Sequence, residues 1–140
     1  RIFSVYGPYD NPDTLVSTAI RQLLQNNTPL ITKGEQQWDY LYADDLARAL
    51  YLLGEKGKAN SVYCLGSGQT RSIKEYIEVL RNYIDPNKII HWGGIPYDNN
   101  QIMHLCANIG ALTKDTGFLP EIPFEDGIKK TINFYRNELK

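Results

Sequence analysis

The sequence lacks the spacing patterns through which many domains perform redox, phosphoryl-transfer or metal chemistry. The Gly-Ser-Gly run at 66–68 opens like a dinucleotide-binding loop, but Arg71 stands where that loop needs a third small residue. None of the ten tyrosines is followed four residues later by a lysine, whose ammonium group would lower the tyrosine pKa for proton transfer. No P-loop occurs, and His91 and His104 have no metal-ligand spacing. We therefore expect no catalytic residue and no metal site in this chain.

Some side chains leave two interpretations open. Asp44 and Asp45 could act as an acid/base pair, but their position at the start of a predicted helix favours capping and an interaction with the helix dipole. The tyrosines could flank a base or a sugar, or they could simply pack in the core and at its edges. Cys64 and Cys106 lie in apolar contexts, which favours buried thiols over catalytic ones.

Composition limits the classes of partner. The 140 residues are one domain's worth of chain, and 42% hydrophobic with 22% charged residues is ordinary globular composition. A net charge of −1 argues against nucleic acid or an anionic membrane surface as the main partner. No apolar run approaches the roughly 20 residues that cross a bilayer. Two cysteines are too few for a disulfide framework, so we expect a cytoplasmic protein.

Strand-like and helix-like segments alternate along the chain. The helix expected at about 14–25 has Asp13 as its N-cap, and Ser72 with Glu75 forms a capping box at the start of another helix. Strands are expected at 1–6, 29–32, 38–42, 61–65 and 88–92, and further helices after Asp45, at 108–116 and at 124–139. This alternation indicates an α/β architecture with mainly parallel strands.

Several of these segments together resemble a known family. Residues 1–8 (RIFSVYGP) are similar to the R-x-x-N-V-Y-G-P segment of the extended short-chain dehydrogenase/reductases, the NAD-dependent epimerase/dehydratase family. Residues 34–49 resemble its G-x-x-x-x-R-D-Y-V-Y-V-D-D-L-A-x-A run, and residues 63–68 its Y-N-L-G-S-G. Residues 112–120 and 124–128 resemble its L-G-W-x-P and L-E-E-G-I elements. The matches are collinear over essentially all of the chain.

The resemblance implies a fold and a missing half. Residues 1–140 would be the carboxy-terminal, substrate-binding portion of a Rossmann-type NAD(P)-binding enzyme, with the last strands of the sheet and the small substrate-binding subdomain. NAD or NADP would be held mainly by the absent amino-terminal half, which carries the Gly-rich loop and the catalytic tyrosine. Because the chain opens within a strand at Arg1, we expect a fragment that catalyses nothing alone.

The resemblance also implies which residues would contact the nicotinamide cofactor and the nucleotide-sugar substrate. Phe3, Ser4 and Val5 would pass the nicotinamide, with Ser4 also reaching the substrate phosphate. Backbone groups of Thr14, Leu15 and Val16 would meet the diphosphate, because helix starts favour anions. The remaining residues expected to touch the substrate are Pro29, Leu30 and Ile31 beside the nucleobase, together with Trp38, Asp98 and Gln101.

Two of these positions depart from the family. Trp38 and Asp98 stand where the family often has arginines that reach the diphosphate, so Arg21, Arg71 or Lys33 would have to supply positive charge. Trp38 could stack on a base or pack. The segments around Ser4, Trp38 and Gln101 are most similar to reductase-type members, which reduce a 4-keto sugar.

Three functions remain open from the sequence. The chain could be the substrate-binding part of a nucleotide-sugar epimerase, dehydratase or reductase, a freestanding nucleotide-sugar binding module, or a structural or interaction domain. An exposed sheet edge and apolar helix faces lead us to expect a homodimer.

Overall fold

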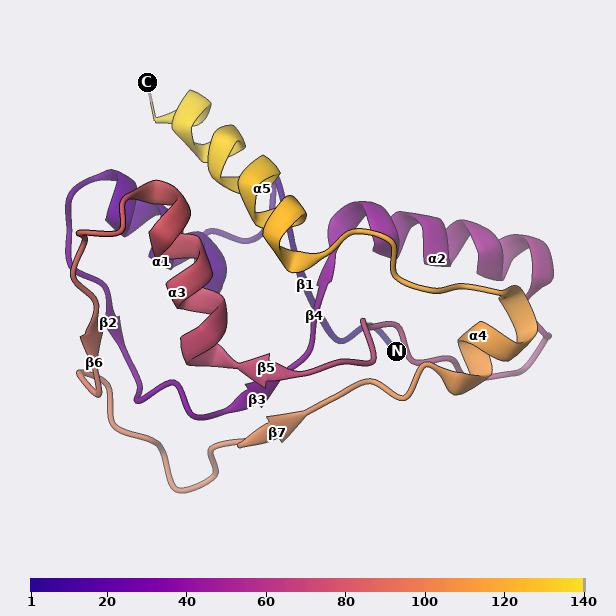
Figure 1. Cartoon of the computed structure of the whole chain (residues 1–140). Helices are drawn as coiled ribbons and strands as arrows, with labels where there is room; N and C mark the ends of the chain where they lie inside the picture. The colour runs from indigo at the N-terminus through magenta and orange to yellow at the C-terminus, as the bar shows by residue number, and fades with distance from the viewer. Residues whose placement is uncertain (140) are drawn as a thin grey trace.

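A computed structural model describes residues 1–139, in which helices alternate with short strands (Figure 1). The strands are β1 (Ser4–Tyr6), β2 (Leu30–Ile31), β3 (Gln37–Trp38), β4 (Tyr40–Tyr42), β5 (Arg71–Ser72), β6 (His91–Trp92) and β7 (His104–Leu105). The helices are α1 (Leu15–Leu24), α2 (Ala43–Lys56), α3 (Ile73–Ile84), α4 (Gly110–Thr116) and α5 (Phe124–Glu138). The α/β class predicted from the alternation is confirmed.

Most of the strand pairs are parallel, as the sequence predicted. β1 pairs with β4 and β2 with β6, both in parallel. β3 lies in the middle of a small sheet, parallel to β7 and antiparallel to β5. The two-residue strands β5 and β7 were not predicted, because so short a segment shows no periodicity.

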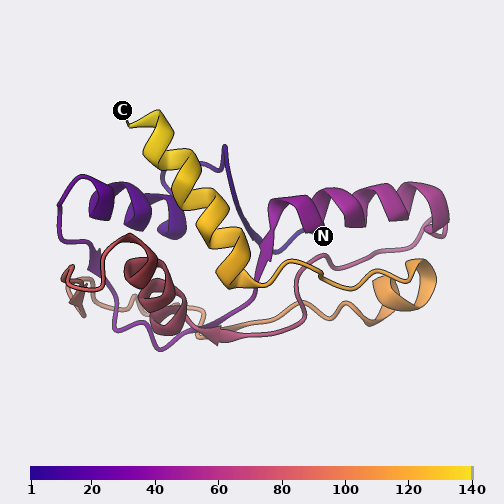
Figure 2. The same cartoon turned by 45° about the horizontal axis from the view of Figure 1, so that its top comes forward.

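The helices fall into two groups on either side of β1 and β4 (Figures 1 and 2). α1, α3 and α5 pack around one hydrophobic core, to which Ile20, Leu80 and Ile128 contribute fully buried side chains. α2 and α4 enclose a second, smaller core around Leu112 and Phe118. Each such side chain contributes about 1.5–3 kcal/mol through burial. The buried apolar residues of α1, α3 and α5 lie on one face of each helix, whereas Leu50 on the apolar side of α2 is 47% exposed.

The predicted strand at 38–42 is wrong as a single element. The chain bends at Asp39, so that β3 belongs to the small sheet and β4 pairs with β1. Asp39 is fully buried, and its carboxylate accepts the backbone N–H groups of Ser67, Gly68 and Ala107 at 2.7, 3.0 and 3.0 Å. The Asp39 carboxylate thus interrupts the strand-like segment at 38–42. Through its hydrogen bonds it joins this segment to the turn at 67–68 and to the segment at 107.

Several strands and helices begin or end at other residues than the sequence predicted. The predicted strand at 61–65 contributes only a parallel bridge between Leu65 and Ile2, and β1 begins at Ser4 rather than at Arg1. The N-cap of α1 is Thr14, not Asp13, because the helix starts one residue later. The capping box of Ser72 and Glu75 is confirmed, as is the helix end at Gly117, which has φ 75°.

Asp44 and Asp45 lie in the first turn of α2, as expected, but the cap is Tyr42 and carries no side-chain hydrogen bond. Asp45 is buried, and its Oδ2 accepts the backbone N–H groups of Glu121 and Ile122 at 3.0 and 2.9 Å. It holds the segment that leads into α5 rather than capping its own helix. Within residues 1–139, no helix is long and apolar enough to span a membrane.

Candidate functional site

Ser4 and Trp38 meet directly. The indole N–H of Trp38 donates to Oγ of Ser4 at 2.7 Å, although the two residues lie 34 positions apart. Both side chains are half-buried, and Ser4 is in register with Tyr40 across the β1–β4 pair. Phe3 and Val5, the other residues predicted to pass a nicotinamide, are half-buried on either side of Ser4. The bend at Asp39 makes this contact possible, because Trp38 stays in the small sheet while Tyr40, two residues later, pairs with Ser4 of β1.

The start of α1 presents backbone N–H groups. Its N-cap, Thr14, makes no side-chain cap hydrogen bond, and the first turn contains no acidic residue. The Thr14 hydroxyl donates instead to Oδ2 of Asp10 at 2.8 Å. Val16 is 2% exposed and packs in the core, so only its backbone can contact a ligand. Unpaired N–H groups at a helix start favour an anion.

The predicted nucleobase segment forms β2 and pairs with β6. Pro29 and Ile31 are buried, whereas Leu30 is 54% exposed. The backbone N–H of Ile95 donates to the carbonyl of Ile31, which joins β2 to the loop that carries Asp98 and Gln101. Leu30 is therefore the only side chain of the three that is open to a ligand.

Asp98 and Gln101 lie in that loop after β6. The hydrogen bonds of Asp98 stay within its own turn, where it accepts the backbone N–H groups of Asn100 and Gln101. The loop then returns to the small sheet, where the Gln37 N–H donates to the Met103 carbonyl at 2.9 Å. The structure thus brings Ser4 and Trp38 together and places Asp98 and Gln101 on a connected but separate loop.

The positive charge that Arg71 was expected to offer a diphosphate is already neutralised by an ion pair within the chain. Its guanidinium pairs with the carboxylate of Glu125 at the start of α5, with a second contact of 3.3 Å. This pairing lowers the pKa of Glu125 and raises that of Arg71. Arg21 lines a separate cavity of about 300 Å³ beside Asp10 and Glu138. Neither arginine contacts Trp38 through a hydrogen bond found in residues 1–139.

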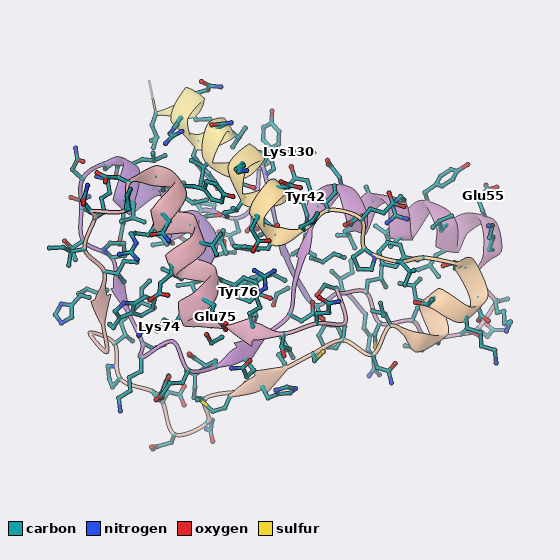
Figure 3. The ribbon with its side chains drawn as sticks, viewed as in Figure 1. Tyr42, Glu55, Lys74, Glu75, Tyr76 and Lys130 are labelled. Carbon is teal, nitrogen blue, oxygen red and sulfur yellow. The ribbon has the colours of Figure 1, made fainter. Side chains whose placement is uncertain are left out.

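The tyrosines near the site pack rather than titrate. Tyr6, Tyr40, Tyr42 and Tyr76 form an aromatic cluster with Phe124, with ring centroids 4.6–6.4 Å apart. Burial raises the pKa values of Tyr6 and Tyr40 far above neutrality. Figure 3 shows Tyr76 at the start of α3, and Tyr42 beside Lys130, whose Nζ lies 5.5 Å from the Tyr42 ring centroid.

A larger cavity of about 560 Å³ lies between the turn at residues 67–70, the start of α3 and the segment before α5. Gln69, Arg71, Tyr76 and Phe124 line it. Arg71 was considered as a source of positive charge, but none of the residues expected to touch the cofactor or the substrate lines this cavity. Its walls come from four distant segments, so no local spacing could have revealed it. Asp39, which holds its turn, was also missed, since its only signal was a carboxylate inside a strand-like run. Within residues 1–139, no three His, Cys, Asp or Glu side chains cluster to hold a metal ion.

Comparison with known proteins gives consistent matches. Residues 1–66 match the model of the NAD dependent epimerase/dehydratase family. The chain is 29% identical to dTDP-glucose 4,6-dehydratase 1 of Escherichia coli over 142 residues, which cover 96% of this chain and 39% of that protein. It is also 29% identical to the human dTDP-D-glucose 4,6-dehydratase over 144 residues, with 97% and 40% coverage. The chain thus spans about two-fifths of the length of these relatives.

Solved structures match over the whole chain. A UDP-glucose 4-epimerase from Thermotoga maritima, solved with UDP-glucose, superposes with a TM-score of 0.91 at 26% identity and covers 100% of this chain and 46% of its own. An NAD-dependent NDP-hexosamine 5,6-dehydratase of tunicamycin biosynthesis superposes with a TM-score of 0.87 at 30% identity, covering 98% and 45%. The described fold is therefore the carboxy-terminal portion of a Rossmann-type enzyme fold, as predicted.

Proposed function

Because residues 1–66 match the model of the NAD dependent epimerase/dehydratase family and the whole chain superposes on solved members, we propose that the chain belongs to this family and is the nucleotide-sugar-binding portion of an NAD(P)-dependent epimerase, dehydratase or reductase. One observation carries the proposal: the fold matches, over its full length, that of an epimerase solved with UDP-glucose. The local geometry of β1, β3 and α1 supports it.

Ser4 is suited to a polar contact with the ligand. A hydroxyl has one donor and two acceptor sites, and the Trp38 indole uses one of the acceptors. The Ser4 hydroxyl proton therefore remains free to donate to a sugar or phosphate oxygen. Because the indole N–H is occupied, Trp38 can offer a ligand only its ring, which suits stacking rather than ion pairing.

The diphosphate would lie at the start of α1. The backbone N–H groups of Leu15 and Val16 point toward the helix start, and the first turn itself contains no acidic residue. The Asp10 carboxylate, which accepts the Thr14 hydroxyl, lies beside this helix start, so the diphosphate would have to approach the N–H groups from another side. The nucleobase would lie against Leu30, the exposed residue of β2, between Pro29 and Ile31. Asp98 repels phosphate, so it and Gln101 would instead accept and donate hydrogen bonds at sugar hydroxyls.

In the intact enzyme a hydride would pass between C4 of the sugar and the nicotinamide, which supplies the redox chemistry when bound. Val5 of β1 and Phe3, which precedes the strand, are half-buried and would lie beside such a ring. A tyrosine in the part of the relatives that this chain does not span would move the hydroxyl proton. The present residues would orient the sugar and exclude water, which accelerates transfer by positioning.

We further propose a cofactor, an oligomeric state and a cellular compartment for the intact protein. The cofactor is NAD or NADP, to be distinguished by titrating the intact protein with each. The protein forms a homodimer, supported by Leu50 and Tyr51 on α2, which are 47% and 67% exposed, and tested by light scattering. It works in the cytoplasm, supported by the free thiols Cys64 and Cys106 and tested by fractionation of cells.

Calorimetric titration of the chain with UDP-glucose and dTDP-glucose tests the proposal. We expect saturable binding of at least one of them. Heat that does not saturate with either ligand, from a chain shown to be folded, would refute it and favour a structural or interaction domain.

A further inference from the structure

The cavity of about 560 Å³ beside the turn at residues 67–70 shares no residue with the set assigned to the nucleotide-sugar. It lies on the α3 and α5 side of the bend at Asp39, between Arg71, Tyr76 and Phe124. Its volume falls within the roughly 300–1,000 Å³ of small-molecule sites. The cavity could therefore hold a ligand whether or not the chain binds a nucleotide-sugar.

The rim of the cavity is held rigid without a ligand. Oδ1 of Asp39 accepts both the N–H and the hydroxyl of Ser67, at 2.7 and 2.6 Å, and Oδ2 accepts the N–H of Gly68. Gly68 has φ +74°, and an added Cβ would lie 3.1 Å from the side chain of Ile109. The Gln69 N–H donates to Ser67 Oγ. A turn so constrained presents its side chains with little further loss of entropy on binding.

The lining combines ring faces with hydrogen-bonding groups. Tyr76 and Phe124 line the cavity through the small part of their rings that is exposed, 4% and 7%, with Pro120 and Pro123 nearby. The Arg71 guanidinium lies 5.8 Å from the Tyr76 ring centroid. Along the rim, Gln69 and Thr70 carry side-chain polar groups that bond to no other residue in 1–139. A purely apolar ligand would leave these groups without partners, which is unfavourable. The lining therefore suits a ring with apolar faces and polar edges.

The charges around the cavity favour a neutral ligand. The guanidinium of Arg71 is paired with Glu125, so its charge is compensated before any ligand binds. Glu121, which also lines the cavity, pairs with Arg48 at 3.2 Å and remains 70% exposed. A phosphate group would meet this carboxylate without a free cation to offset it.

We propose that this cavity is a second binding site, which takes a neutral polyhydroxylated ring such as a glycoside or a cyclitol. The ring faces pack against Tyr76 and Phe124, and the hydroxyls bond to Gln69, Thr70 and the unpaired N–H groups of Arg71. The site shares no lining residue with the surface formed by Ser4 and Trp38, which it adjoins through the Tyr76 hydroxyl that donates to the Trp38 carbonyl at 3.0 Å.

Backbone amide chemical shifts of the isotope-labelled 140-residue chain test this. The probes are methyl α-D-glucopyranoside, myo-inositol and inorganic phosphate, each titrated alone. We expect saturable shifts at Gly68, Gln69, Thr70 and Ile122 with at least one neutral probe and none with phosphate. Gln69→Ala should weaken the binding about fivefold, because one hydrogen bond is lost.

Gln25→Ala is the matched control, since Gln25 is exposed at the end of α1, away from the cavity, and should leave the affinity unchanged. The proposal is overturned if neither neutral probe gives saturable shifts, if phosphate shifts the same amides, or if both variants weaken binding equally. Loss of UDP-glucose binding in a separate titration would bear on the proposed function alone.

Discussion

The indole N–H of Trp38 donates to Oγ of Ser4 at 2.7 Å, and this hydrogen bond links the small sheet to the β1–β4 pair. It sets the orientation of both side chains on the surface proposed for the nucleotide-sugar. The bond exists because the chain turns at the buried Asp39 between β3 and β4. Each of these residues can be tested separately.

Ser4→Ala should weaken nucleotide-sugar binding about three- to tenfold, because the free hydroxyl proton that meets the ligand is removed. Trp38→Phe should weaken it by a similar factor, since it keeps a ring but releases the Ser4 hydroxyl. Calorimetry with UDP-glucose measures both. Ser61→Ala is the control, because Ser61 is exposed and its side chain is hydrogen-bonded to neither Ser4 nor Trp38; an equal loss there would contradict the assignment.

Asp39→Asn should destabilise the fold by roughly 2–4 kcal/mol. The carboxylate accepts four hydrogen bonds, and an amide places N–H groups against the N–H donors of Gly68 and Ala107 or of Ser67. Urea denaturation measures the free energy of unfolding. Asp44→Asn, at an exposed residue 3.9 Å from Lys130, should cost under about 0.5 kcal/mol. Equal effects would show that Asp39 has no special role.

Gly127→Ala should destabilise the fold by about 1–3 kcal/mol, because it overpacks the core. A Cβ there would come 2.3 Å from Oη of Tyr6 and 2.7 Å from the ring of Tyr42. Gly54→Ala is the matched control in α2, where an added Cβ meets nothing within 4 Å. That change should stabilise the helix by up to about 1 kcal/mol. Thermal unfolding should therefore shift in opposite directions for the two variants.

The ion pair of Arg71 and Glu125 predicts a dependence of stability on pH. The hydrogen bond from Arg71 lowers the pKa of Glu125 in the folded chain. The pair therefore stabilises the fold above the unfolded glutamate pKa of about 4.3, and this contribution is lost as the pH falls through the folded pKa. Because both side chains are more than a third exposed, we expect the ion pair to contribute at most about 0.5 kcal/mol to the free energy of unfolding.

Urea denaturation at pH values on both sides of that range measures the effect. Glu125→Gln should remove part of the acid-side decline in stability, whereas the same substitution should change nothing further in an Arg71→Gln background. A decline that is unchanged by Glu125→Gln would assign it to other carboxyl groups.

The sequence predicted the features that depend on local pattern. The capping box of α3 is encoded within four residues and is confirmed. The strand at 38–42 was wrong because the deciding interaction joins Asp39 to Ser67 and Ala107, which are distant in the chain. The two-residue strands β5 and β7 exist only through their pairing with β3.

The same contrast between local patterns and long-range contacts holds for the candidate site. The resemblance placed Ser4 and Trp38 in one binding region, and the structure gives them a direct hydrogen bond. Nothing in the sequence indicated that Arg71 would be neutralised by Glu125, because that pair joins residues 54 positions apart. For the same reason the cavity beside Arg71 became visible only in the folded chain.

The most direct test is to follow backbone and indole N–H chemical shifts during a titration with UDP-glucose. We expect saturable changes at Ser4, Leu15, Val16, Leu30 and the Trp38 indole, with little change at Gln69 and Thr70. Saturable changes confined to other residues, or none at all in the folded chain, would contradict the claim that this surface holds a nucleotide-sugar.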